Sequence, residues 1–135
     1  MESSISRILV VDDFEPWRRA ICSMLAEHPN LQVVGEAIDG VEAVQKAQEL
    51  KPDLILLDIS LPGLNGIEAA RRVLEIIPDV KVLFVTSNVD RDVAAAALTD
   101  GAFGYVLKVD GKNEILRAIN AVLRGEKIIS KRLKP

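Results

Sequence analysis

The stretch Ile8-Leu9-Val10-Val11-Asp12-Asp13 places two carboxylates directly after four consecutive apolar residues. A run that is apolar at every position, rather than at alternate positions, is typical of a strand buried on both faces of a parallel sheet. Four further apolar runs follow along the chain: Val33-Val34, Leu54-Ile55-Leu56-Leu57, Val82-Leu83-Phe84-Val85 and Tyr105-Val106-Leu107. The sequence therefore predicts five strands in one parallel sheet that helices cover on both sides.

Between these runs, apolar residues recur at helical spacing. The stripes are Trp17, Ile21, Met24 and Leu25; Val44 and Leu50; Ile67, Ala70, Leu74 and Ile77; and Ile115, Ile119, Val122 and Leu123, with a short alanine-rich helix expected at 92–98. Asp39 and Glu42 have the spacing of a capping box at the start of the second helix. A strand followed by a helix, five times over, predicts an α/β fold with a doubly wound sheet.

Polar residues follow four of the five apolar runs. They are Asp12 and Asp13 after the first run, Asp58 after the third, Thr86 and Ser87 after the fourth, and Lys108 after the fifth. The carboxyl ends of parallel strands share one edge of the sheet, which is where open α/β folds bind ligands. We therefore expect three carboxylates, hydroxyl groups and one ammonium to converge at this edge.

This set of side chains suits a magnesium-dependent phosphoryl transfer. Three carboxylates in one crevice repel one another unless a cation lies among them, and oxygen ligands favour a hard ion such as Mg²⁺. A carboxylate can attack phosphorus to form an aspartyl phosphate, provided that a metal and a fixed cation or hydroxyl offset the charge of the phosphoryl oxygens. Lys108 and Thr86 would supply the ammonium and the hydroxyl.

Composition and charge narrow the class of protein. The chain has 135 residues, of which 49% are hydrophobic and 27% charged, as in a single globular domain. A net charge of −3 argues against a domain that binds nucleic acid by itself. The single cysteine, Cys22, fits a reducing compartment, and neither a signal peptide nor an apolar stretch of membrane-spanning length is present in the sequence.

Four motifs, in this order, resemble those of the receiver domain of bacterial two-component response regulators. They are Val11-Asp12-Asp13, Asp58-Ile-Ser-Leu-Pro-Gly-Leu-Asn-Gly66, Thr86-Ser87 and Gly101-Ala-Phe-Gly-Tyr-Val-Leu-Lys108, and the resemblance spans residues 6–125. It implies a flavodoxin-like (βα)5 fold in three layers with strand order 2-1-3-4-5. It also implies a phosphorylation-activated signalling switch rather than an enzyme, one that at most catalyses its own phosphorylation and dephosphorylation.

The resemblance implies a role for each residue at the edge of the sheet. Asp58 would accept the phosphoryl group from a cognate sensor histidine kinase or a small acyl phosphate, with Thr86 and Lys108 contacting that group. As the switch, Thr86 and Tyr105 would relay the change to the face made by the fourth helix, fifth strand and fifth helix.

The same resemblance implies a Mg²⁺ site. Asp13 and Asp58 would bind the ion directly together with the backbone carbonyl of Ser60, while Asp12 would act through a water molecule. No other cofactor is expected.

Two further stretches, Asp39-Gly-Val-Glu-Ala43 and Ala118-Ile-Asn-Ala-Val-Leu-Arg-Gly-Glu126, are similar to receivers that are joined to a C-terminal LuxR/NarL-like helix-turn-helix domain. This implies a transcriptional output, with any DNA contact made by a C-terminal domain outside this segment, unless the chain is a stand-alone receiver. The alanine-rich segment Ala94–Ala97 favours a homodimer through the fourth or fifth helix on phosphorylation. We expect a cytoplasmic location and no contact with a membrane. We divide the chain into a receiver domain, 1–125, and a basic linker or tail, 126–135.

The chain departs from the family pattern at two positions. Leu61 stands where methionine is frequent, which is a mild apolar exchange. Val109 follows Lys108 where proline is common, and a cis bond before a residue other than proline costs about 2.5–4 kcal/mol. The sequence leaves the geometry of this bond open.

Other interpretations compete with the switch. A phosphatase with an aspartyl nucleophile usually carries a second Asp two residues later, where this chain has Ser60, and a flavodoxin-like redox carrier would need a phosphate-binding loop where it has Asp12-Asp13. A receiver that binds partners without phosphorylation is a further alternative. Among single residues, Thr86 and Ser87 could simply cap a helix, and Tyr105 could be ordinary core.

Overall fold

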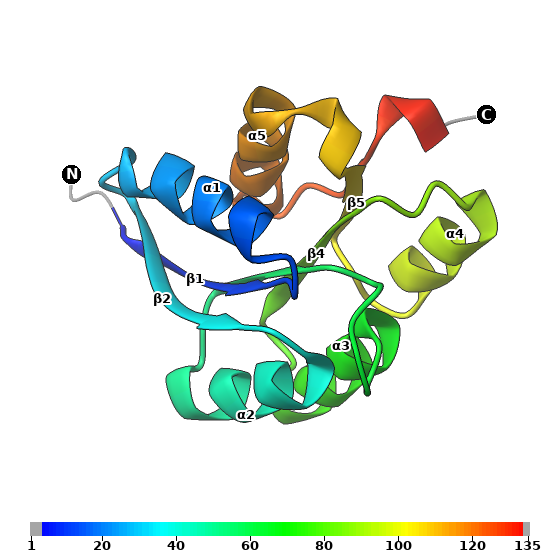
Figure 1. Cartoon of the computed structure of the whole chain (residues 1–135), viewed down its shortest axis with the longest axis horizontal. Coiled ribbons are helices and arrows are strands. Elements are labelled where there is room, and N and C mark those ends of the chain that lie inside the picture. The colour runs from blue at the N-terminus through cyan, green and yellow to red at the C-terminus, as the bar shows by residue number, and fades with distance from the viewer. Residues whose placement is uncertain (1–3, 134–135) are drawn as a thin grey trace.

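The structure, a computed structural model, describes residues 4–133 and consists of a parallel sheet with helices packed on both faces (Figure 1). The strands are β1 (Ser6–Val11), β2 (Leu31–Ala37), β3 (Leu54–Leu57), β4 (Lys81–Thr86), β5 (Gly104–Leu107) and β6 (Ile128–Ile129). The helices are α1 (Glu15–Ala26), α2 (Gly40–Leu50), α3 (Gly66–Ile76), α4 (Arg91–Thr99) and α5 (Lys112–Leu123). The sheet order is β2-β1-β3-β4-β5-β6, so the predicted α/β fold and the order of its first five strands are confirmed.

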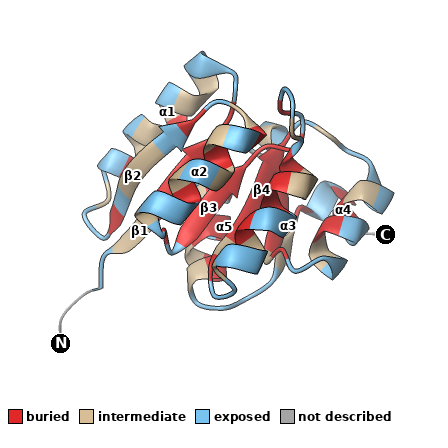
Figure 2. Cartoon of the chain, turned by 90° about the horizontal axis from the view of Figure 1, so that it is seen from below, coloured by how far each residue is buried: buried red, intermediate tan, exposed pale blue. Residues whose placement is uncertain are grey.

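Two apolar cores lie on opposite faces of the sheet, and the sheet itself is the most deeply buried layer (Figure 2). In β1, Leu9 and Val11 face the core under α2, α3 and α4, while Ile8 and Val10 face the core under α1 and α5. This alternation is the two-residue period of a strand. It explains why every position of the run Ile8–Val11 is apolar.

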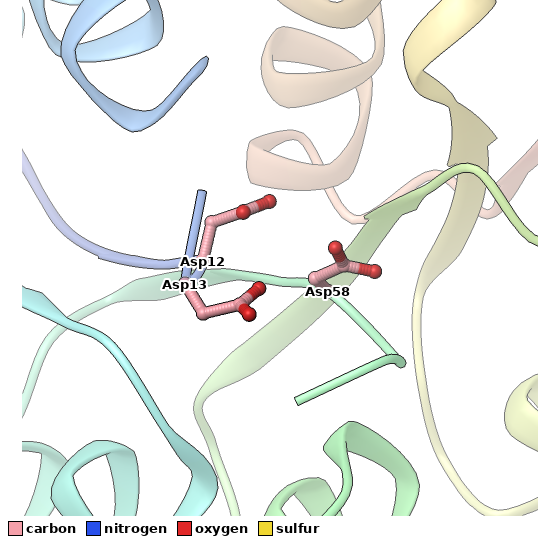
Figure 3. Close-up of side chains that lie close together, drawn as sticks. All are labelled: Asp12, Asp13 and Asp58. Carbon is pink, nitrogen blue, oxygen red and sulfur yellow. The ribbon is translucent and has the colours of Figure 1, made fainter. Parts of the chain in front are cut away.

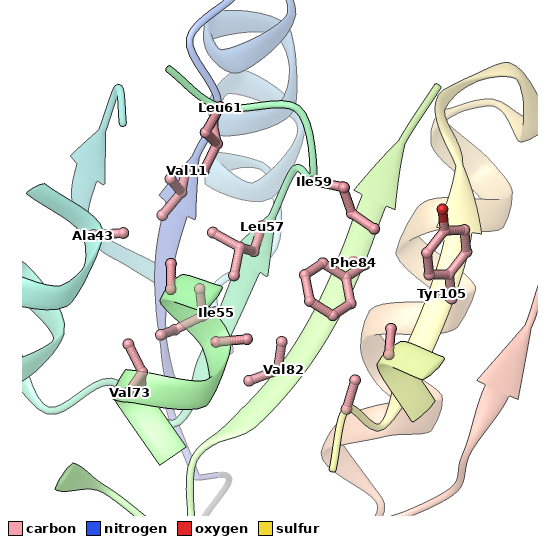
Figure 4. Packing of buried hydrophobic residues seen from close by; sticks show 14 of the residues in the cluster. Val11, Ala43, Ile55, Leu57, Ile59, Leu61, Val73, Val82, Phe84 and Tyr105 are labelled. Carbon is pink, nitrogen blue, oxygen red and sulfur yellow. The ribbon is translucent and has the colours of Figure 1, made fainter. Parts of the chain in front are cut away.

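The larger of the two cores has an aromatic pair near the β5 side of the sheet (Figure 4). The ring centroids of Phe84 and Tyr105 lie 6.1 Å apart with the ring planes tilted by 51°. Such tilted geometry is favourable for aromatic side chains. Tyr105 is therefore a core residue, which is one of the two interpretations of this tyrosine. Its hydroxyl also donates a hydrogen bond, to the Asn88 carbonyl.

Side-chain caps fix the starts of the helices. Asp39 Oδ1 accepts a hydrogen bond from the Glu42 amide of α2 at 2.7 Å, while the Glu42 carboxylate accepts from the Ile38 amide at 2.8 Å, one residue before the position of a standard capping box. At α4, Asp90 accepts from the amides of Asp92 and Val93. Thr86 and Ser87 therefore do not cap α4, and α4 extends one residue beyond each expected end.

A glycine keeps the loop after β3 tight. A Cβ atom at Gly66 would lie 2.0 Å from the carbonyl oxygen of Asp58, so only glycine lets the start of α3 approach the end of β3 this closely. The Gly66 amide donates to the Ile59 carbonyl at 2.9 Å, which closes the loop. The loop thereby holds Asp58 firmly at the end of its strand.

The segment expected as a linker continues the sheet. Strand β6 pairs in parallel with β5, with Tyr105 opposite Ile129, and a short 3-10 helix, η2 (Lys131–Leu133), follows it. Leu133 is buried in the core that contains Tyr105. The segment 126–133 is thus packed against the rest of the domain and is not an extended linker, whereas Lys134 and Pro135 lie outside the described residues.

Peptide bonds in the described part of the chain are all trans, including the bond between Lys108 and Val109. Within residues 4–133, no helix has the length and apolar character needed to cross a membrane.

Candidate phosphoryl-transfer and metal site

The three predicted carboxylates converge at the carboxyl ends of β1 and β3 (Figure 3). One oxygen atom from each of Asp12, Asp13 and Asp58 can be chosen so that the three atoms lie within 4.8 Å of one another. Asp12 and Asp58 are buried, while Asp13 is exposed. Because β1 and β3 are neighbours in parallel register, residues that follow both strands must meet at this edge.

Lys108 lies between the two buried carboxylates. It begins a short 3-10 helix, η1 (Lys108–Asp110), directly after β5. Its Nζ atom lies 2.7 Å from Asp12 Oδ2 and 3.1 Å from Asp58 Oδ2. The side chain is 18% exposed, so solvent screens these contacts less than it would on the surface.

The aromatic ring of Trp17 provides a third contact to the same ammonium. Lys108 Nζ lies 4.7 Å from the ring centroid, within the range of a cation–π interaction. The sequence predicted Trp17 only as part of the apolar stripe of α1. Its contact with the site joins residues that are far apart in the chain, so helical spacing gave no signal of it.

The first turn of α1 is fastened to the end of β1. Asp12 Oδ1 accepts a hydrogen bond from the Phe14 amide at 2.8 Å, and the Asp12 carbonyl accepts one from the Arg18 guanidinium at 2.8 Å. Arg18 also pairs with Glu36, from β2, at 2.8 Å. These contacts fix the position of Asp12 and of α1 relative to each other.

Burial and charge shift two pKa values at the site. Burial raises the pKa of Asp12 above its ordinary value of 3.8, although the contact with Lys108 and the hydrogen bond from Phe14 oppose that shift. Burial alone would lower the pKa of Lys108, but the contact with Asp12 and the charge of Asp58 outweigh it and raise this pKa. Lys108 is therefore an ammonium at neutral pH, and it faces a carboxylate whose charge is costly.

The donor set fits a hard divalent cation. All three converging side chains offer carboxylate oxygens, the ligand type that Mg²⁺ prefers. Asp12 Oδ2 is fully buried and, among the described residues, makes no aligned hydrogen bond, although Lys108 is close. A second positive charge beside it would offset the cost of burying this carboxylate. The exposed side chain of Asp13 leaves the cluster open to solvent on one side.

The predicted switch residues Thr86 and Tyr105 meet at one residue, Asn88. Thr86 Oγ1 accepts a hydrogen bond from the Asn88 amide at 3.2 Å, and the Tyr105 hydroxyl donates to the Asn88 carbonyl at 2.9 Å. Burial raises the pKa of Tyr105 to about 12, with smaller contributions from the charges of Asp58 and Asp90. Of the other predicted residues, Ser87 and Ser60 are exposed, and the Ser60 amide donates to Asp58 Oδ1 at 3.3 Å.

Asp110 holds the turn after Lys108. Its Oδ2 atom accepts a hydrogen bond from the Leu107 amide at 3.0 Å, and its Oδ1 atom accepts one from Arg132 of η2 at 3.0 Å. The sequence predicts a role at the site for neither residue. Arg132 belongs to the basic tail, and nothing in the local sequence links it to position 110.

Comparisons with known proteins agree on the family of this chain. The family model described as "Response regulator receiver domain" matches residues 8–120. The chain is 43% identical over 124 residues to the response regulator GacA of Pseudomonas viridiflava, covering 92% of this chain and 58% of that protein. It is 40% identical over 120 residues to the transcriptional regulatory protein LiaR of Bacillus subtilis, covering 89% of this chain and 57% of that protein. The chain thus spans less than two thirds of the length of these relatives.

A solved structure extends the agreement to the fold. A two-component response regulator of the LuxR family from Aurantimonas sp. SI85-9A1 superposes with a TM-score of 0.92 at 34% identity, covering 96% of this chain and 93% of that one. The match of the family model covers most of the chain and includes the acidic cluster and Lys108. The chain belongs to the family of receiver domains of two-component response regulators.

Proposed function

We propose that this domain accepts a phosphoryl group on Asp58 from a sensor histidine kinase or a small acyl phosphate. The observation that carries the proposal is the buried Asp58 carboxylate at the end of β3, with Lys108 Nζ at 3.1 Å and the two other acidic groups beside it. An Asp58 oxygen would attack phosphorus and form a new P–O bond. The bond from phosphorus to the donor would break, and the donor would leave as the histidine imidazole or as a carboxylate such as acetate.

Mg²⁺ would be held by Asp13 and Asp58 directly, with the Ser60 carbonyl, and by Asp12 through water. When bound, the ion would offset negative charge on the phosphoryl oxygens. Lys108 would do the same from the side of β5, and it would orient the group through a charge-assisted hydrogen bond. Asp12 would hold Lys108 at this side through the 2.7 Å contact.

The switch would work through Asn88. As Thr86 turns its hydroxyl toward the phosphoryl group, it would give up the hydrogen bond from the Asn88 amide. The Asn88 carbonyl is the acceptor for the Tyr105 hydroxyl, so a shift of Asn88 would change how Tyr105 is held. The change would then reach the face made by α4, β5 and α5, because Tyr105 lies on β5 and packs in the core under α4.

The output would be transcriptional, as the name of the LiaR relative says of that protein. We place the domain in the cytoplasm, where it would meet a cognate kinase, and we propose that phosphorylation promotes a homodimer. A contact with DNA would belong to a part of a longer protein that lies outside this segment.

Intact mass after incubation with Mg²⁺ and acetyl phosphate tests the proposal. We expect one phosphoryl adduct on the wild type and on Asp79→Asn, an exposed carboxylate before β4 that serves as the matched control, and none on Asp58→Asn. An adduct on Asp58→Asn would move the acceptor to another residue. If Mg²⁺ binds but no adduct forms on any variant, the domain binds its partners without phosphorylation and the proposal fails.

A further inference from the structure

The ammonium of Lys108 is held from three directions, and only two of them are carboxylates. Asp12 and Asp58 contact it at 2.7 and 3.1 Å, and the ring of Trp17 faces it at 4.7 Å from the centroid. Trp17 is the single tryptophan of the chain. Its position in the first turns of α1 brings a large ring to the side of the site that the carboxylates leave free.

The ring is fixed relative to the site. Trp17 is half-buried and packs against the core under α1 and α5. The next residue, Arg18, donates to the Asp12 carbonyl and pairs with Glu36, and Pro16 stands in the first turn of α1. A proline at this position favours the helix start, because its backbone is already restricted to a helical φ. The contacts of Arg18 therefore hold the backbone of α1 beside the end of β1, and packing against the core restricts the ring.

The three contacts respond differently to a bound divalent cation. The carboxylates of Asp12 and Asp58 would share their charge with the cation, which weakens their hold on Lys108, and the cation itself would repel the ammonium. The face of an indole ring attracts an ammonium through its quadrupole, but it offers no oxygen ligand for a hard, hydrated ion. The contact with Trp17 is thus the one of the three for which the cation would not compete.

We propose that Trp17 is a positioning residue, which keeps the Lys108 ammonium beside Asp58 while a divalent cation occupies the acidic cluster. The inference rests on the proposed phosphoryl transfer to Asp58. It goes beyond that transfer by giving a role to a residue outside the carboxylate, hydroxyl and lysine set. The contact of Trp17 with the site is the one with the Lys108 ammonium, so its effect would pass through Lys108.

The first test measures the rate of phosphoryl uptake from acetyl phosphate with Mg²⁺ for the wild type, Trp17→Leu and Trp17→Phe. Leucine keeps apolar volume without an aromatic face, and phenylalanine keeps a face. We expect Trp17→Leu to be slower by roughly 2- to 30-fold, the range that corresponds to a cation–π contact, and Trp17→Phe to recover most of the rate. Because phenylalanine also restores volume, the free energy of unfolding of both variants is measured in urea. A purely structural role would lower stability and rate together, whereas a positioning role lowers the rate of Trp17→Leu at equal stability of the two variants.

The matched control is a second cation–π contact at the opposite edge of the sheet. Lys81 Nζ lies 4.9 Å from the ring centroid of Phe103, and both residues are half-buried. Phe103→Leu should leave the rate of phosphoryl uptake unchanged. Equal rates for Trp17→Leu and the wild type would overturn the inference, and so would an equal loss in Phe103→Leu.

The second test is spectroscopic and needs no phosphorylation. Since Trp17 is the single tryptophan, its fluorescence reports the surroundings of one ring. We expect Lys108→Met to change the emission of the free protein. We also expect the emission of the wild type and of Lys108→Met to differ when Mg²⁺ and beryllofluoride, a phosphoryl mimic, are bound. Superimposable spectra of the wild type and Lys108→Met would refute the contact itself. If these spectra differ but the wild type takes up no phosphoryl group, the proposed function fails while the contact stands.

Discussion

Replacing Lys108 by methionine would show how much the acidic cluster depends on its internal cation. Methionine keeps most of the length of the side chain but removes the charge. Asp12 and Asp58, whose side chains are 0% and 8% exposed, would then face each other without a counter-ion. We expect Lys108→Met to fold but to have a lower free energy of unfolding than the wild type in the absence of divalent cations.

The size of this loss follows from the burial of the two carboxylates. Removing one partner of a buried ion pair costs about 3–5 kcal/mol. A buried carboxylate that has lost its partner can avoid the cost of its charge by taking up a proton. For a carboxylate with the ordinary pKa of 3.8, protonation at pH 7 costs about 4.4 kcal/mol, at 1.36 kcal/mol per pH unit. This value limits what one unpaired carboxylate can cost. We therefore expect a loss of about 3 kcal/mol at pH 7.

The cost of protonation also predicts how the loss of stability in Lys108→Met depends on pH. At pH 5, protonation of one carboxylate from a pKa of 3.8 costs only about 1.6 kcal/mol, so we expect the loss in Lys108→Met to be smaller than at pH 7. A divalent cation should replace the missing ammonium. Millimolar Mg²⁺ should then stabilise Lys108→Met more than it stabilises the wild type, since a ligand that binds only the folded state raises its stability.

Urea denaturation at pH 7 and pH 5, with and without Mg²⁺, measures these differences. Lys81→Met is the matched control, because Lys81 is a half-buried lysine at the opposite edge of the sheet. Equal unfolding free energies of Lys108→Met and the wild type at pH 7 would show that the two carboxylates are well solvated or share a proton. Either explanation would refute the claim that Lys108 offsets their burial.

Three other predictions concern the tail, the buried carboxylate and the tyrosine. Leu133→Ala should lower the free energy of unfolding by about 2–3 kcal/mol in urea denaturation, because Leu133 is buried. Lys131→Ala should have little effect, because Lys131 lies in the same 3-10 helix but is exposed. Asp12→Asn should be more stable than the wild type at pH 7 without Mg²⁺. Burial raises the pKa of Asp12, so ionisation costs stability as the pH rises above 3.8, and the gain of the variant should disappear at lower pH. The single tyrosine, Tyr105, should titrate near pH 12 in an ultraviolet absorbance titration of the folded protein, and a midpoint near 10 would mean that its ring is solvated.

Most of the fold could be predicted because its signals are local. Runs such as Ile8–Val11 and Leu54–Leu57 are apolar at every position, and this alone indicates strands buried on both faces. The convergence of Asp12, Asp58 and Lys108 then follows from parallel strands, since their carboxyl ends share one edge. The positions of these three side chains needed no knowledge of how the helices pack.

The sixth strand could not be predicted in the same way. Ile128-Ile129 is a run of only two apolar residues among basic ones, which is too short to indicate a strand. Its place depends on Gly104, where a Cβ atom would lie 2.7 Å from the Ile128 side chain. The Ile128 and Ser130 amides donate to the carbonyls of Phe103 and Tyr105, so the strand is defined by partners that precede it by about 25 residues.

The tail bears on the site through the turn after Lys108. In this chain Val109 replaces the proline common in the family, and the Val109 side chain is exposed, so it adds no packing that would fix the turn. Asp110 fixes it instead, by accepting a hydrogen bond from the Leu107 amide, and Arg132 pairs with the other oxygen of the same carboxylate. The position of Lys108 therefore depends on residues that follow α5. A chain that ended at residue 125 would keep every residue of the acidic cluster. It would lose the contact between Arg132 and Asp110, which helps to hold the turn that carries the Lys108 ammonium.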